Sequence, residues 1–160
     1  MGFNQSNQLD RIDRNIVRLL QRDARIAHTE LARCVGLSTT PCKERVRLLE
    51  RDGVIQHYQA VLDPAALDRA LVVFVQIRFN RTSQDIFEEF TAAALDLAEV
   101  QECYLVSGNF DYLIKARVAD MNAYRDLLGE TLLTLPGVQE STSYVVMEQV
   151  KESLMLPVPP

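Results

Sequence analysis

Hydroxyl and charged side chains recur along residues 38–51, in a pattern that suits one side of a helix. Those assigned to this side are Ser38, Thr39, Thr40, Lys43, Glu44 and Arg47. Short hydroxyls at a helix start suit phosphate, because free backbone N–H groups and the positive end of the helix dipole lie there. Lys43 or Arg47 could hydrogen-bond a guanine edge, and Glu44 could accept from cytosine. This chemistry predicts contact with the major groove of DNA, with backbone phosphates left to Arg25, Arg33, Arg45 and Arg51.

Three predicted helices would hold this surface. The third has Cys42, Val46 and Leu49 at i, i+4 and i+7, so they should face a core, with Ser38 or Thr40 as N-cap and Gly53 at its end. Two helices precede it, from near Asp10 and over 29–35, the latter ended by a left-handed Gly36. Residues 9–53 therefore predict a helix-turn-helix domain. The alternative is an ordinary helix with a solvated face.

Charge is distributed unevenly along the chain. Residues 1–60 carry ten Lys and Arg against seven Asp and Glu, a net charge of +3, whereas residues 61–160 carry seven against fifteen, a net charge of −8. This asymmetry favours a polyanion partner for the first part only. Three cysteines and two histidines, widely spaced, predict neither a disulfide framework nor a zinc site, and no apolar run is long enough to span a membrane. We expect a protein of the reducing cytoplasm.

The period of the hydrophobic pattern changes after residue 53. Residues 54–62 predict a strand, followed by a short helical turn through Leu67; this linker occupies 54–69. Residues 70–150 then predict strands and helices in the order βαββαβ, a ferredoxin-like domain in an α+β protein. Its predicted strands cover 70–79, 100–108, 111–118 and 138–150, and its helices run from Ser83 to Leu97 and from Asp120 to Leu135. The terminal LPVPP is expected to be unstructured.

Four segments carry a family resemblance that covers residues 9 to about 153. They read LDRIDRNIVRLLQRDAR, ELARCVGLSTTPCKERVRLLERDGVI, ECYLVSGNFDYLIKARV and MNAYRDLLGETLLTLPGVQESTSYVVMEQVKES. The chain resembles the Lrp/AsnC family of feast/famine transcriptional regulators. The resemblance implies an N-terminal helix-turn-helix domain, winged-helix-like or plain, and a C-terminal domain that binds amino-acid effectors. It also implies control of amino-acid metabolism genes, and homodimers that assemble further, commonly to octamers, on nucleoid DNA.

The SGNFDY turn, residues 107–112, is the candidate effector site. Its N–H groups could bind the carboxylate of an amino acid and Asp111 its ammonium, but the residues alone favour a hairpin turn in which Asp111 bonds backbone. The resemblance implies an effector site near this turn, at an interface between dimers. The implied set is Leu105, Gly108, Asn109, Asp111, Met121, Tyr144, Val145 and Val146. The resemblance implies an acidic residue at the position of Asn109, so this departure is expected to change ammonium binding or the choice of effector.

Apolar residues of both parities in 70–79 and 143–150 predict a sheet buried on two sides, and hence a symmetric dimer through its open face. No cofactor is expected beyond an aliphatic amino-acid effector such as leucine. The siroheme decarboxylases, which are similar in plan, offer an enzymatic alternative. Catalysis on a tetrapyrrole calls for His and Arg around a large cavity, yet His28 and His57 both precede the ferredoxin-like domain. A third reading, a sensor without DNA binding, conflicts with the basic residues at 43–51.

Overall fold

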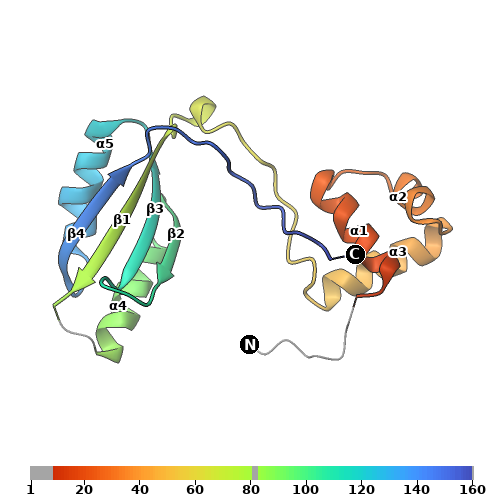
Figure 1. Cartoon of the computed structure of the whole chain (residues 1–160), viewed down its shortest axis with the longest axis horizontal. Coiled ribbons are helices and arrows are strands. Elements are labelled where there is room, and N and C mark those ends of the chain that lie inside the picture. Colours follow the sequence, from red (N-terminus) through yellow and green to blue (C-terminus); the bar gives the residue numbers. More distant parts are fainter. Residues whose placement is uncertain (1–8, 81–82, 160) are drawn as a thin grey trace. The chain divides into compact units, whose positions relative to one another are not determined.

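The chain divides into two compact units. The computed structural model describes residues 9–80 and 83–159. A helical unit contains residues up to 61 together with 151–159, and a sheet unit contains residues 62–150 apart from the two that are not described (Figure 1). Each unit has its own hydrophobic core. The helical unit therefore consists of two stretches of chain that are far apart in sequence.

Three helices form the core of the helical unit: α1 (Arg11–Arg22), α2 (His28–Val35) and α3 (Thr39–Arg51). A capping box begins α1, because the Asp10 carboxylate accepts from the Asp13 N–H at 2.8 Å and the Asp13 carboxylate accepts from the Asp10 N–H. The buried side chains that join the three helices are Ile16, Leu20, Leu31, Ala32, Cys42, Val46 and Leu49. The predicted inward face of α3 is thus confirmed.

The turn between α2 and α3 follows the predicted geometry. Gly36 ends α2 with a left-handed φ of 74°, a conformation that costs glycine little. The next N–H, that of Leu37, donates to the carbonyl of Ala32 at 2.9 Å. Ser38 is the N-cap of α3, which resolves the choice between Ser38 and Thr40. Pro41 accordingly lies in the first turn, where its missing N–H costs no helix bond.

The predicted strand at 54–62 is wrong. Val54 and Ile55 donate their N–H groups back to the Leu49 carbonyl at 2.9 and 3.0 Å, which wraps the chain around the end of α3. The following residues run exposed and without a strand partner to a 3₁₀ turn at Ala65–Leu67. A strand requires a hydrogen-bonded neighbour, and the described residues of the helical unit offer none. The β-branched composition of the segment therefore misled the prediction, and no wing forms in this unit.

The sheet unit has the predicted βαββαβ order. Its strands are β1 (Leu71–Phe79), β2 (Val100–Leu105), β3 (Tyr112–Val118) and β4 (Val138–Val145), and they lie side by side in the order β2-β3-β1-β4, with every neighbouring pair antiparallel. The helices α4 (Gln84–Leu95) and α5 (Met121–Asp126) cover one face of the sheet (Figure 1). Ser83 and Asp120 cap them as predicted. The ferredoxin-like architecture is confirmed.

The largest differences from the predicted bounds of the sheet unit lie in its last helix and its last strand, while β2 and α4 end two or three residues early. The helix expected to continue to Leu135 becomes a π-helical turn at Leu127–Thr131 and a 3₁₀ turn at Leu132–Thr134. Gly129, a poor helix former, lies within the π turn. The last strand stops at Val145 rather than residue 150, because its partner β1 begins at Leu71 and the Val146 N–H makes the final bond, to the Val72 carbonyl.

The second face of the sheet is not covered by the helices. By the strand register, Val72 and Phe74 of β1 point to this open face, together with Tyr104 on β2 and Tyr144 on β4. The two tyrosines are each about half exposed. Val73, Val75, Ile77 and Phe79 alternate with them and are buried beneath the helices. β1 is thus apolar on its helix-covered face and at Val72 and Phe74 of its open face, whereas Gln76 and Arg78 continue the open face with polar side chains and most of β4 is exposed.

The prediction of an unstructured C-terminus is also wrong. Residues 156–159 lie against α1, where Arg18 and Gln21 hydrogen-bond their backbone. The proline-rich composition suggested disorder, but prolines also favour an extended backbone with unpaired carbonyls, which polar side chains can bind. Within the described residues, no helix combines the length and the apolar character that a membrane crossing requires.

Candidate functional site

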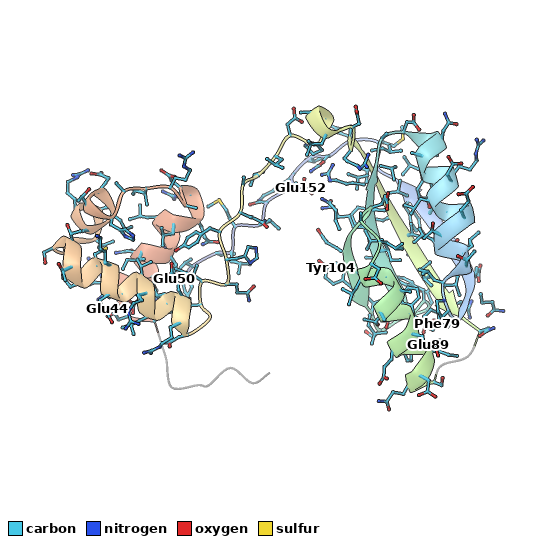
Figure 2. The ribbon with its side chains drawn as sticks, turned by 180° about the vertical axis from the view of Figure 1, so that it is seen from behind. Glu44, Glu50, Phe79, Glu89, Tyr104 and Glu152 are labelled. Carbon is cyan, nitrogen blue, oxygen red and sulfur yellow. The ribbon has the colours of Figure 1, made fainter. Side chains whose placement is uncertain are left out.

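The outer side of α3 carries the side chains that the sequence assigned to DNA. Thr40, Lys43, Glu44, Arg47 and Arg51 are exposed, and Glu44 is seen projecting from the helix in Figure 2. Thr39 is partly exposed, and Ser38 lies at the N-terminal end with extended backbone. The buried stripe of α3 faces the other two helices, so this polar side is turned outward. The structure thus brings these predicted residues together on one continuous surface.

Arg47 and Glu44 form a two-point pair on that surface. Nε and one terminal nitrogen of Arg47 donate to the two carboxylate oxygens of Glu44 at 3.0 and 2.7 Å. Hydrogen bonding from Arg47 lowers the pKa of Glu44, and the carboxylate in turn raises the pKa of Arg47. Arg51 donates through Nε to the carboxylate of the adjacent Asp52 at 2.8 Å. Lys43 is the one cation of α3 without an ion pair to another described residue.

Arg45 has a different environment from the other cations of α3. Its guanidinium donates to Asp10 at 2.6 Å and to Asp13 at 2.8 Å, both at the start of α1, and only 32% of its side chain is exposed. The hydrogen bonds to Asp13 and Asp10 raise the pKa of Arg45. This geometry ties α3 to α1 rather than leaving the guanidinium free for phosphate. Arg25 lies in the α1–α2 loop, exposed, and its backbone N–H donates to Asp23.

The SGNFDY turn is fixed by Asp111. Its N–H donates to the Ile77 carbonyl at 2.9 Å, and one of its carboxylate oxygens accepts from the Phe79 N–H at 2.8 Å. Its own carbonyl accepts from the Val106 N–H at 2.9 Å, which closes the loop. Asp111 therefore bonds backbone, as the residues alone favoured, although the main partner is the neighbouring strand β1. An effector ammonium would have to share a carboxylate that already supports the fold.

The eight predicted effector residues fall into two groups at opposite ends of the sheet. Leu105 and the 108–111 turn lie beside Ile77 and Phe79, at the end of β1. Val145 pairs with Val73 and Val146 bonds Val72, near the start of β1. The strand β3 finishes at that same end of the sheet, and α5 begins just after it with Met121 (Figure 1). Six residues of strand separate Val73 from Phe79, about 20 Å at the usual strand rise. One chain therefore does not bring the two groups together.

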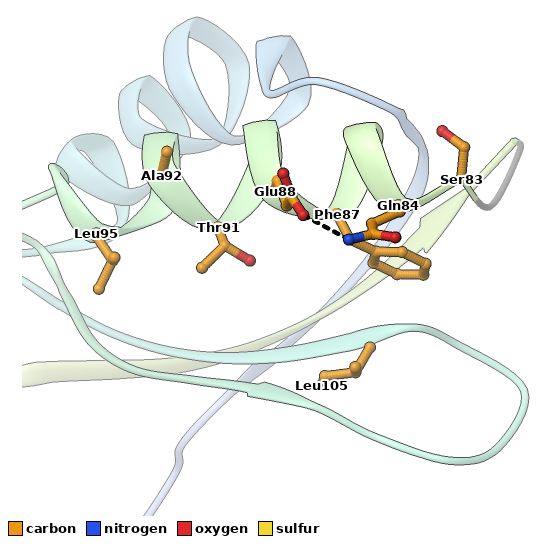
Figure 3. Close-up of a pocket in the computed structure, with 8 residues that line it drawn as sticks. All are labelled: Ser83, Gln84, Phe87, Glu88, Thr91, Ala92, Leu95 and Leu105. Atoms are coloured by element: carbon orange, nitrogen blue, oxygen red, sulfur yellow. Dashed lines mark hydrogen bonds between the residues drawn. The ribbon is translucent and has the colours of Figure 1, made fainter. Parts of the chain in front are cut away.

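An open groove lies between α4 and the edge strand β2. It has a volume of about 750 Å³, and Figure 3 shows Phe87 and Leu95 on one side and Leu105 on the other. Its remaining lining residues are Ser83, Gln84, Glu88, Thr91 and Ala92. Gln84 donates to Glu88 at 2.9 Å across the helix surface. Of the predicted effector residues only Leu105 contributes to this groove, so the prediction did not identify it.

A small polar hollow of about 100 Å³ lies next to the turn, on the open face of the sheet. Asn109 and Phe110 of the turn line it, together with Gln76, Arg78, Glu140 and Thr142. Arg78 and Glu140 are 3.7 Å apart and carry the two charges complementary to a free amino acid. Neither was predicted. The alternation of side chains along β1 could have indicated Arg78, because residues 76 and 78 must lie on the same face of the strand. Its partner Glu140 on β4 could not be predicted, since that pairing depends on the strand register.

The arrangement defines a class of two-unit transcriptional regulators in which a helix-turn-helix unit is joined to a ferredoxin-like ligand-binding unit. Two family comparisons agree with it: residues 9–50 match the AsnC-type helix-turn-helix domain, and residues 72–156 match the Lrp/AsnC ligand binding domain. The chain belongs to the Lrp/AsnC family. Since this is a family of regulators, the enzymatic alternative is set aside.

Similar proteins cover nearly all of the chain. The leucine-responsive regulatory protein of Salmonella typhimurium is 63% identical over 145 residues, which is 91% of this chain and 88% of the relative. Its counterpart in Escherichia coli K12 is 62% identical over the same shares. Among solved structures, a transcriptional regulator of Neisseria meningitidis in complex with L-Met superposes with a TM-score of 0.89 at 35% identity, covering 94% of this chain and 97% of that one.

Proposed function

We propose that this protein binds DNA through α3 and that a small aliphatic amino acid, such as leucine, changes that binding. The observation that carries the proposal is the exposed face of α3, which lies opposite a fully packed apolar stripe. Thr39, Thr40, Lys43, Glu44 and Arg47 would face the major groove, with Ser38 at the helix start near phosphate. Arg25 and Arg51 would contact phosphates. We assign Arg45 to holding α3 on α1 instead.

The effector site would be completed by a second copy of the chain. The turn that contains Gly108, Asn109 and Asp111, with Leu105 beside it, would come from one protomer. Met121, Tyr144, Val145 and Val146 would come from another, because these two groups lie too far apart within one chain. Relatives named as leucine-responsive, and one structure with L-Met, support an amino acid with an apolar side chain. Asn109 in the turn would tune which amino acid binds.

The assembly we propose is a homodimer through the open sheet face, which would cover Phe74 and the half-exposed Tyr104, and then further association, to an octamer by resemblance to the family. A twofold dimer would present two copies of α3 to a pseudo-palindromic site, with half-sites one helical turn or a multiple apart. The protein would act in the cytoplasm on nucleoid DNA, at genes of amino-acid metabolism.

Binding measurements with defined DNA test this proposal. Duplexes selected from random sequence by the purified protein would be titrated at several salt concentrations, with and without each of the common amino acids. We expect selective binding that weakens with salt, and a shift in affinity or assembly for an aliphatic amino acid. Failure to select any sequence would overturn the DNA role. Selection without a response to any amino acid would overturn the effector role alone.

A further inference from the structure

Two side chains of α1 bind the backbone of the C-terminal segment, residues 154–159. The amide of Gln21 makes a two-point contact with Leu156: its Nε2 donates to the Leu156 carbonyl at 3.1 Å, and the Leu156 N–H donates to its Oε1 at 2.7 Å. The Arg18 guanidinium donates to the carbonyls of Val158 at 3.1 Å and Pro159 at 2.6 Å. These contacts join residues that are 135 to 141 positions apart in sequence.

The chemistry of the segment matches the side chains that bind it. Pro157 and Pro159 lack an N–H and fix an extended backbone, so the segment cannot pair as a strand and its carbonyls remain free acceptors. Arg18 supplies donors only, which suits the two carbonyls near the prolines. Gln21 supplies a donor and an acceptor, which suits Leu156, where an N–H is present. Leu154 and Leu156 keep 71% and 75% of their surface exposed, so the contact depends on backbone recognition.

The docked segment gives the helical unit a second connection to the sheet unit, which is covalent along the chain and held on α1 by hydrogen bonds. The chain leaves the helical unit after Val61 and re-enters it at Lys151. A single linker without helix or strand, such as residues 56–61, would leave the helical unit free to adopt many orientations. A second attachment removes most of those orientations, provided that residues 154–159 stay bound to α1.

We propose that this docked segment is a tether that limits the orientation of the DNA-binding unit, and thereby makes affinity depend on the distance between two half-sites. The inference rests on the proposed function, because two helical units of one assembly must occupy the same duplex. When both helical units are restrained, binding of the first unit gives the second a high effective concentration at the other half-site. This happens only where the half-site spacing matches the separation of the two units. When the tether is released, units on one flexible linker reach many spacings about equally well. Arg18 and Gln21 are thus positioning residues.

Three variants release the tether in different ways. One lacks residues 154–160, and the others carry Arg18→Ala or Gln21→Ala. Arg22→Ala is the matched control for Arg18→Ala, because it removes the same charge from the same helix. Arg22 is exposed, and its side chain makes no hydrogen bond with a described residue. A purely electrostatic effect on DNA would lower affinity equally in both arginine variants.

The measurement uses duplexes with two copies of the selected half-site, separated by a distance stepped in single base pairs through one helical turn. For the wild type we expect affinity to vary about tenfold with spacing, and for the releasing variants less than about threefold, at unchanged affinity for a single half-site. A variant that combines Gln21→Ala with the deletion should show the same spacing dependence as either change alone, because both changes release the same segment. Amide exchange at Leu156 should be slow in the wild type and fast in Gln21→Ala.

The outcomes separate this inference from the function on which it rests. If the wild type selects no DNA sequence, both are overturned. If the wild type shows a spacing preference that the deletion variant keeps, only the tether is overturned. Rapid exchange at Leu156 in the wild type would have the same meaning, since the segment would then be undocked. A deletion variant that dissociates to monomers would also count against the tether, because the segment would act in assembly instead.

Discussion

The two candidate sites of this protein are built in different ways. The proposed DNA contacts lie mostly along α3, a single helix of 13 residues, on the side opposite its buried Cys42, Val46 and Leu49. The proposed effector contacts come from two strand ends, a turn and a helix start, and they divide between opposite ends of the sheet. One chain presents the first surface complete, whereas it presents the second in two parts.

This difference bears on how the protein is regulated. A surface complete in one chain can bind DNA in any assembly state that leaves it exposed. A site divided between chains exists only in the assembly that joins its two parts. An effector that binds such a site must favour that assembly, because a ligand shifts an equilibrium toward the state that binds it better. If the effector site is divided as proposed, we expect the effector to regulate DNA binding through assembly.

The largest expected effect tests whether the two units are separable. Ile16 of α1 is fully buried in the core of the helical unit, and the two cores share no residue. Ile16→Ala should destabilise the helical unit by about 2–5 kcal/mol, because it removes buried methylenes and leaves a cavity. Thermal unfolding followed by calorimetry should show one transition moving to lower temperature and a second one unchanged.

The matched control is Ala94→Gly on α4, a buried position in the sheet unit. It should move the other transition, because glycine weakens a helix interior. If Ile16→Ala shifted both transitions together, the units would unfold as one, and the contrast between a self-contained and a divided site would lose its structural basis.

The next effect separates two roles of Asp111. Asp111→Ala leaves the Phe79 N–H without its acceptor, so we expect a loss of about 1–3 kcal/mol in the stability of the sheet unit. Asp111→Asn keeps an acceptor oxygen and removes the charge, so the fold should persist while binding of an ammonium weakens. Calorimetry with the amino acid that binds wild type, alongside thermal unfolding, distinguishes the two. Wild-type binding by Asp111→Asn would remove this carboxylate from the effector site.

A comparable effect is expected on the DNA side. Arg47→Ala should reduce affinity by about 1–3 kcal/mol and relax the preference at one base position, if Arg47 reads a base edge. Arg51→Ala should weaken binding to all sequences alike and reduce the salt dependence. Competition among duplexes mutated at single positions measures both. Equal losses over every duplex in Arg47→Ala would make this arginine a phosphate contact.

Local pattern accounts for what the sequence could predict. The buried stripe of α3, the left-handed Gly36 and the caps Ser83 and Asp120 depend on neighbours within a few residues, and all were found as expected. The predicted strand at 54–62 was wrong because a strand depends on a partner that no local pattern specifies. Docking of residues 154–159 on α1 escaped prediction for the same reason, as did the pairing of Arg45 with Asp10 and Asp13.

The division of the effector residues also depends on register. Met121 and Val145 are far from Asp111 because β1 is nine residues long and they lie near its other end. A family resemblance supplies the members of such a set, but not which chain each one comes from. The sequence could therefore propose the members of the effector site, but their division between two ends of the sheet became visible only with the strand register.

The smallest expected effect concerns the start of α1, which also supports α3. The N–H of Asp13, together with Arg45, lowers the pKa of Asp10 below its usual 3.8. The ionised form of Asp10 is thus favoured in the folded state. Its contribution to the free energy of unfolding is present above about pH 4 and disappears as the pH falls through the lowered pKa.

Asp10→Asn keeps an N-cap acceptor without the charge. It should cost less than about 1 kcal/mol near neutral pH, because solvent screens an exposed pair, and less still near pH 2. Urea unfolding of both forms at these two pH values measures the difference. A pH-independent difference would show that the cap, and not the charge, links α1 to α3.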